Sequence, residues 1–124
     1  MNKEITLLDG LFSEFIRKRA IVTAGGCERC KTPKRSYKQL QCSHFAGRAA
    51  KSVRWDEENA AGLCGACHMY FTAHPFEHNK WFMERLGDRF ELLMVRRRST
   101  WPKPDRKMIE LYLRQKIKEF GEVA

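Results

Sequence analysis

The fold is decided by residues 63–75, LCGACHMYFTAHP, in which two cysteines stand at Cys-x-x-Cys spacing and a histidine follows the second. The segment CERC, residues 27–30, provides an earlier pair with the same spacing. Two such pairs supply four thiolates, which is the tetrahedral ligand set that structural Zn²⁺ prefers. No βαβ pattern surrounds either pair, so a redox-active dithiol is the weaker interpretation. The predicted zinc ligands are Cys27, Cys30, Cys64 and Cys67.

Length and composition limit what can surround this zinc site. With 124 residues, of which 43% are hydrophobic, the chain is long enough to bury one modest core, so residues 1–124 are predicted to form a single domain. Lysine and arginine number 24 against 15 acidic residues, and the net charge of +9 predicts a polyanionic partner. Nucleic acid is the first candidate for that partner and an anionic membrane surface is the second.

The chain has no apolar stretch long enough to cross a membrane. Asp9 and Glu14 interrupt the N-terminal segment, where a signal peptide needs an unbroken apolar run. We therefore expect a soluble, cytoplasmic protein. In that reducing compartment the five cysteines are better explained as metal ligands and packed thiols than as disulfides.

Apolar residues at helical spacing predict helices on both sides of the cysteine-rich stretch. Residues 1–24 are predicted to form one helix that ends before Gly25 and carries the cations at 17–19 in its last turn. Residues 25–75 form the zinc-bound core, and residues 76–124 form a helical extension. The extension divides into three helices, of which the first is closed by Gly87 and the last opens at Pro104-Asp105. Their apolar positions are Phe76, Phe82, Met83 and Leu86, then Phe90, Leu93 and Met94, and finally Met108, Leu111, Tyr112 and Ile117.

A histidine, an asparagine and a second histidine are interleaved with the cysteine pairs. His44 follows a predicted strand, YKQLQC at residues 37–42, while Asn59 and His68 frame the segment NAAGLCGACH. At these residues the chain resembles the HNH endonucleases, whose ββα-metal core has a histidine ending its first strand, an asparagine in the following loop and a metal ligand on the helix. The segments CSHFAGR and SVRWDEEN resemble the small phage and prophage nucleases related to the lambda NinG recombination protein. The resemblance implies an α+β fold with a small zinc-stabilised, treble-clef-like core between flanking helices.

The resemblance also implies separate roles in phosphodiester hydrolysis. His44 is the general base that activates water, Asn59 braces the loop around it, and His68 binds a catalytic divalent ion, Mg²⁺ or Mn²⁺. Because His68 directly follows Cys67, the zinc would fix the start of its helix, so that both imidazoles converge on one cleft. The alternative is that both histidines merely pack around a zinc knuckle.

The chain departs from the family pattern directly before the base. Many members have an aspartate or a second histidine there, whereas this chain has Ser43, and a hydroxyl is a poor ligand for Mg²⁺ or Mn²⁺. The second ligand of the catalytic ion is therefore open, and the candidates are His74, Cys42, Asp56 and His44 itself. The structural alternatives are surface or packing roles for His74 and His78, a buried inert thiol for Cys42 and a turn cap for Asp56.

Basic residues indicate where a polyanion would bind. Arg48, Lys51 and Arg54 lie between the first histidine and the asparagine, and they are predicted to contact DNA phosphates beside the scissile bond. Trp55 and Trp101 could stack on bases, although packing is the commoner role of tryptophans with such neighbours. Further positive charge comes from Arg29, Lys31, Lys34 and Arg35, from residues 96–107, and from Arg114, Lys116 and Lys118.

These features together favour a DNA endonuclease. No predicted helix has a polar face suited to reading bases, so low sequence specificity is expected. We therefore expect a metal-dependent enzyme, and the resemblance implies a place in phage recombination or DNA processing. The alternative is a zinc-organised DNA-binding accessory protein without catalysis. The missing acidic neighbour of His44 is the best sequence argument for that alternative.

Overall fold

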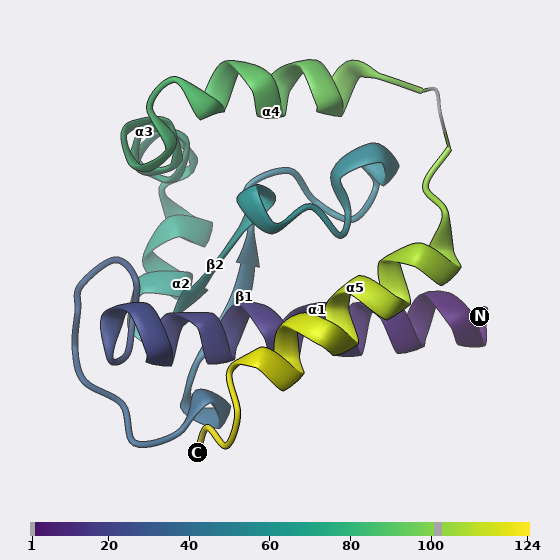
Figure 1. The fold of residues 1–124 in the computed structure, drawn as a ribbon. Helices are drawn as coiled ribbons and strands as arrows, with labels where there is room; N and C mark the ends of the chain where they lie inside the picture. Colours follow the sequence, from purple (N-terminus) through teal and green to yellow (C-terminus); the bar gives the residue numbers. More distant parts are fainter. Residues whose placement is uncertain (1, 101–102) are drawn as a thin grey trace.

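The computed structural model describes residues 2–100 and 103–124, which form helices around a small antiparallel hairpin (Figure 1). This combination is the predicted α+β class. The helices are α1 (Lys3–Ala24), α2 (Gly65–Ala73), α3 (Pro75–Leu86), α4 (Arg89–Arg98) and α5 (Arg106–Glu119), and the strands are β1 (Gln41–His44) and β2 (Ala60–Leu63). The short 3₁₀ turns are η1 (Tyr37–Gln39), η2 (Lys51–Val53) and η3 (Glu57–Asn59). None of the described helices is long and apolar enough to span a bilayer.

Helix α1 ends where the sequence predicted. The Asn2 side chain caps its first turn by accepting from the Glu4 N–H at 2.8 Å, and Gly25 ends it with a left-handed φ of 70°. The prediction that the cations at 17–19 occupy the last turn is wrong. The helix continues through the buried Ala20 and a further turn, so these cations lie in its middle.

The hairpin begins later than the sequence indicated. The pattern at residues 37–42 predicts a strand, but the Ser36 and Gln39 side chains form a capping box that winds the first half into η1. Strand β1 therefore starts only at Gln41, while His44 ends it as predicted. A strong local cap has overridden a short alternating pattern.

The two faces of the hairpin contact different helices. A Cβ added to Gly62 would lie 2.6 Å from the Ala20 side chain, so this face packs directly on α1. Cys42 pairs with Gly62, and His44 stands two residues further along the strand, so both of these side chains point towards α1. Ser43 points to the opposite face, where β2 packs with α2 and α3.

The C-terminal helices begin and end close to their predicted positions. Helix α3 starts at Pro75 and ends before Gly87, whose φ is 57°. Asp105 caps α5 by accepting from the Met108 N–H at 3.2 Å. In Figure 1, α4 runs across the top of the view and α5 lies along α1.

The predicted packing face of α5 is wrong except at Ile117. Met108, Leu111 and Tyr112 are 61%, 63% and 45% exposed, whereas Leu113 is buried. Two apolar stripes at helical spacing compete on this helix, and spacing alone does not rank them. The stripe that packs on α1 consists of Ile109, Leu113 and Ile117.

Three apolar clusters hold the elements together. The first joins the cysteine site and the hairpin to α2 and α3, the second joins α1 to α5, and the third joins α4 to the loop that follows β1. Each cluster includes residues from the hairpin or its loop. Fully buried members are Leu63 and Phe82 in the first, Phe12 and Ile16 in the second, and Val53 and Leu93 in the third.

Candidate functional site

The four predicted zinc ligands form one cluster. Their sulfur atoms all lie within 4.8 Å of one another, and the Sγ atoms of Cys30 and Cys64 are 3.8 Å apart. A tetrahedral ion with Zn–S bonds of about 2.3 Å separates its sulfurs by about 3.8 Å. The cluster could therefore hold a structural metal such as zinc. The clustering of Cys27, Cys30, Cys64 and Cys67 confirms the pairing read from the sequence.

Local backbone geometry builds both halves of this cluster. In the first half, the Lys31 N–H donates to the Cys27 carbonyl at 3.0 Å, and Lys31 takes a left-handed φ of 63°. In the second half, Cys64 is the N-cap of α2, and its Sγ accepts from the Cys67 N–H at 3.4 Å. The N-terminus of a helix carries partial positive charge, so it favours the thiolates that a metal needs.

Neighbouring polar groups tune the sulfurs. A hydrogen bond of 3.0 Å with the Thr32 hydroxyl is the main cause that lowers the pKa of Cys30 to about 6. Burial raises the pKa of Cys67 to about 12, and the Arg29 guanidinium, 3.5 Å from that sulfur, opposes the rise. Binding Zn²⁺ supplies the positive charge that would keep the buried sulfur ionised. Arg29 therefore belongs to the metal site rather than to an open basic surface.

A buried carboxylate connects the cysteine site to the rest of the fold. Glu28 accepts from the Gly62 N–H at 2.6 Å, from Arg85 at 2.6 Å and from Arg19 at 3.4 Å. Arg19 also donates to the Ala60 carbonyl at 2.7 Å. This network ties the first cysteine pair to β2, α1 and α3. Sequence analysis did not find it, because a glutamate inside CERC has no pattern that marks it as buried.

His44 lies at the end of β1 with its ring against α1. The ring centroid is 5.5 Å from that of Phe12. Burial lowers the pKa of His44, the charge of Arg48 lowers it further, and a hydrogen bond with the Arg54 backbone opposes both. The imidazole is therefore neutral at neutral pH. A neutral ring with a backbone partner is suited to accept a proton.

Asn59 braces the loop that follows His44, as the sequence predicted. It is fully buried, and its Oδ1 accepts from the Ala46 N–H at 2.8 Å. Its Nδ2 donates to the carbonyls of Ala46 at 2.9 Å and Val53 at 3.0 Å. These three bonds fix the loop that carries the predicted DNA-binding residues.

His68 lies on α2, in the turn that follows the second cysteine pair. Its Nδ1 is buried and has no hydrogen-bond partner among the described residues. The Nε2 of His78 on α3 is also buried and has no hydrogen-bond partner among the described residues. Burial and the nearby charge of His68 lower the pKa of His78. The His78 ring packs against Phe71 and Phe82, with centroid distances of 5.2 and 5.1 Å.

This arrangement changes the list of candidate ligands. The convergence of His44 and His68 on one cleft stays a prediction: the His44 ring lies against Phe12 of α1, and His68 lies on α2. His78 packs on Phe71 and Phe82, as expected, and it also carries a buried nitrogen without a partner among the described residues. No sequence signal separates this histidine from an ordinary packing residue, because only the turn from α2 into α3 brings it near His68.

The other candidates for the second ligand have other partners. His74 is exposed, and its Nδ1 lies 2.8 Å from the Tyr70 carbonyl of its own helix. Burial raises the pKa of Cys42 to about 12, so that thiol is inert. Asp56 caps η3 and pairs with Arg96 at 2.5 Å. These contacts agree with the structural alternatives, and His74 as a metal ligand stays a prediction without geometric support.

The predicted DNA-binding residues lie on the loop after β1. Arg54 donates to both oxygens of Asp9, at 3.0 and 2.7 Å, whereas the Arg48 side chain is 61% exposed and reaches Asp9 only at 3.9 Å. Lys51 is exposed on η2. Trp55 is half-buried and donates its Nε1–H to Asp9 at 2.9 Å. Trp101, the other candidate for base stacking, lies outside the described residues.

Comparison with known proteins adds no further guide to function. Models of protein families, curated proteins and solved structures give no match to this chain. The function is therefore inferred from the chemistry of the residues described above. The features that bear on it are a four-cysteine cluster, a neutral histidine flanked by arginines, and two further histidines whose buried ring nitrogens have no partner among the described residues.

Proposed function

We propose that the chain is a metal-dependent DNA endonuclease of the ββα-metal (HNH) type, with low sequence specificity. The observation that carries the proposal is His44, a neutral histidine at the end of β1 with Arg48 and Arg54 beside it. The order of β1, β2 and α2, with His68 on the helix, supports it. A role in phage recombination or DNA processing rests on the sequence resemblance alone.

His44 has the properties of a general base. Because its pKa lies below the ordinary histidine value of about 6.5, the ring is unprotonated at neutral pH. It would accept a proton from water as the water oxygen attacks phosphorus. The bond from phosphorus to the 3′ oxygen then breaks, which leaves 3′-hydroxyl and 5′-phosphate ends. General base catalysis of this kind contributes about 10²- to 10⁴-fold to a rate.

Arg48 is the proposed phosphate ligand next to this base. Its guanidinium is largely exposed, and its distance of 3.9 Å from Asp9 is too long for a strong hydrogen bond, so the group can turn towards a phosphate. Arg54 is held by two short bonds to Asp9 and is better suited to fixing the loop.

His68 and His78 are the proposed ligands of the catalytic divalent ion. A buried ring nitrogen without a partner is costly, and a metal ion would satisfy both. Two imidazoles suit Mn²⁺ or another transition metal ion better than Mg²⁺, which prefers oxygen ligands. When bound, the ion would supply positive charge to the phosphate. This pair replaces His74 as the preferred ligand set because its ring nitrogens are buried without partners among the described residues, whereas His74 is exposed.

Nicking of supercoiled plasmid tests the proposal. Wild type, His44→Ala and His74→Ala would be compared with Mn²⁺, Mg²⁺ or Ni²⁺, after zinc content and circular dichroism have shown that all three are folded. We expect His44→Ala to lower the nicking rate by at least about 10²-fold. His74→Ala, a matched change at an exposed histidine, should nick like wild type. A wild-type protein that cuts with none of these ions overturns the proposal.

A DNA-binding accessory protein is the second candidate, and one observation favours it. Ser43 stands directly before His44, where a carboxylate or a second histidine would supply a metal ligand, and a hydroxyl is a poor ligand for Mg²⁺ or Mn²⁺. The same plasmid assay distinguishes the two functions. Wild type that retards the plasmid in a gel but leaves it supercoiled with every ion would be an accessory protein.

A further inference from the structure

A cavity of about 580 Å³ opens between the start of α1, the turn η2 and the end of α4, on the right-hand side of Figure 1. Ile5, Ser52 and Ser99 line it from these three elements and their ends. Cavities of about 300 to 1,000 Å³ are the size that small-molecule ligands occupy. The space is therefore sufficient for one nucleotide, whereas a base pair inside a duplex could not enter it.

Positive charge dominates this cavity. Five cationic side chains line it, and no carboxylate does so among the described residues. Two of the cations are neutralised by acids outside the lining, Arg54 by Asp9 at 2.7 Å and Arg106 by Glu4 at 3.1 Å. The other three form no ion pair within the described part of the chain. They are Lys51, Arg97 and Lys103.

Trp55 gives the cavity an aromatic wall. Its bond to Asp9 holds the indole in one orientation, since the Nε1–H has a fixed acceptor 2.9 Å away. Proteins that bind single-stranded nucleic acid combine a cationic groove with aromatic rings on which bases stack. This cavity has both parts.

We infer that this cavity binds one unpaired nucleotide of a single-stranded DNA segment, with Trp55 against the base and Lys51, Arg97 and Lys103 against the flanking phosphates. The choice of a polynucleotide over another phosphate ester rests on the proposed function. Arg54 connects the cavity to the candidate active site, because it lines the cavity and lies close enough to His44 to influence the pKa of that ring. A strand that leaves the phosphate at His44 would therefore pass into the cavity.

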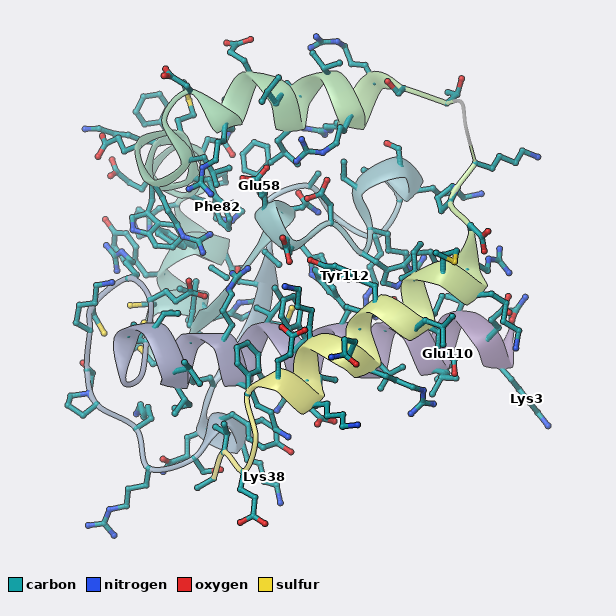
Figure 2. All side chains as sticks on the ribbon, viewed as in Figure 1. Lys3, Lys38, Glu58, Phe82, Glu110 and Tyr112 are labelled. Carbon is teal, nitrogen blue, oxygen red and sulfur yellow. The ribbon has the colours of Figure 1, made fainter. Side chains whose placement is uncertain are left out.

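Fluorescence anisotropy tests this inference without cleavage. The full-length zinc-bound His44→Ala protein, with no divalent ion added, would be titrated into three labelled probes. These probes are a twelve-nucleotide oligothymidylate, a blunt duplex of equal length, and a twelve-unit abasic deoxyribose-phosphate strand. The test variant adds Lys51→Gln and Lys103→Gln. Its matched control adds Arg35→Gln and Lys38→Gln, two exposed cations far from the cavity, as the position of Lys38 in Figure 2 shows.

We expect the oligothymidylate to bind about tenfold more tightly than the abasic strand, because only its bases can stack. The cavity variant should weaken oligothymidylate binding about tenfold. The plot of log affinity against log salt has a negative slope, and its magnitude should decrease by about 1.4 in this variant. The control should change the affinity less than threefold. Equal losses in the two variants, or equal affinity for the abasic strand, overturn the inference. If the wild-type chain nicks no plasmid but the binding results are as expected, the nuclease proposal is wrong and the nucleotide site is supported.

Discussion

At the scale of single residues, the surroundings of His44 have a measurable consequence. Burial and Arg48 lower its pKa, so the unfolded chain binds a proton at higher pH than the folded chain does. The stability that the neutral ring contributes is therefore fully present above about pH 6.5, the ordinary histidine pKa, and is lost as the pH falls through the folded-state pKa.

We predict that Arg48→Gln raises the pKa of His44 towards its ordinary value, because one of the causes of the shift is removed. Proton NMR titration of the imidazole would measure this pKa directly, with His44→Gln used to assign the resonance. The acid limb of any nicking activity should move to higher pH with it. Arg35→Gln removes an equal charge from an exposed distant site and should leave the titration unchanged. Identical curves for the two arginine variants would contradict the prediction.

Individual residues also show what the sequence can and cannot reveal. The family resemblance implied that Asn59 braces a loop, and its three bonds to Ala46 and Val53 form such a brace. His78 was expected only to pack, because its proximity to His68 depends on the angle between two helices. Motif spacing indicates local geometry, but it does not indicate how two helices pack against each other.

At the scale of elements, the contact between α1 and the hairpin requires a glycine. Gly62→Ala places a methyl group 2.6 Å from the Ala20 side chain, so the helix must move away from the sheet. We predict a loss of about 2 kcal/mol in the free energy of unfolding, the usual cost of overpacking. Urea denaturation followed by circular dichroism would measure it.

The double variant Gly62→Ala with Ala20→Gly checks the cause of this loss. The second change removes the methyl group that the first one meets, so it should recover part of the stability even though glycine costs about 1 kcal/mol in the middle of a helix. Stabilities that are simply additive would mean that the two side chains do not collide.

The cysteine cluster is the second element with a direct test. Cys64→Ser removes one of four ligands, and metal binding contributes on the order of 10 kcal/mol to folding in such sites, so we predict loss of bound zinc and unfolding of the hairpin region. Elemental analysis and circular dichroism would report both changes. Cys42→Ala is the matched control, because that half-buried thiol lies outside the cluster and its loss should leave one zinc per chain. Unchanged zinc content in Cys64→Ser would exclude the four-cysteine site.

Elements differ in how well the sequence predicted them. Helix ends were predicted well where a single residue sets them, as Gly25 and Gly87 do through left-handed backbone angles. The packing face of α5 was predicted poorly, because two apolar stripes have the same helical spacing. Packing against α1 buries Leu113 and leaves Leu111 exposed. The predicted start of β1 is wrong, because the capping box at Ser36 forms a 3₁₀ turn where the alternating pattern predicted a strand.

At the scale of the whole molecule, the three apolar clusters are connected through shared elements. Helix α1 contributes Phe12 to the cluster with α5 and Ala20 to the cluster with the cysteines. Glu28 adds ion pairs from the cysteine site to α1 and α3. Loss of packing at one end of α1 should therefore be transmitted to the metal site at the other.

Leu113→Ala tests this connection. The side chain is buried against Phe12 and Phe15, so its truncation should cost about 3 kcal/mol. If the molecule unfolds as one unit, urea should release zinc, measured with a chromogenic chelator, at the same lowered midpoint at which helix content is lost. Met108→Ala, at a position that is 61% exposed on the same helix, should shift neither midpoint appreciably. Zinc release that keeps its wild-type midpoint in Leu113→Ala would show that the metal site unfolds independently of α5.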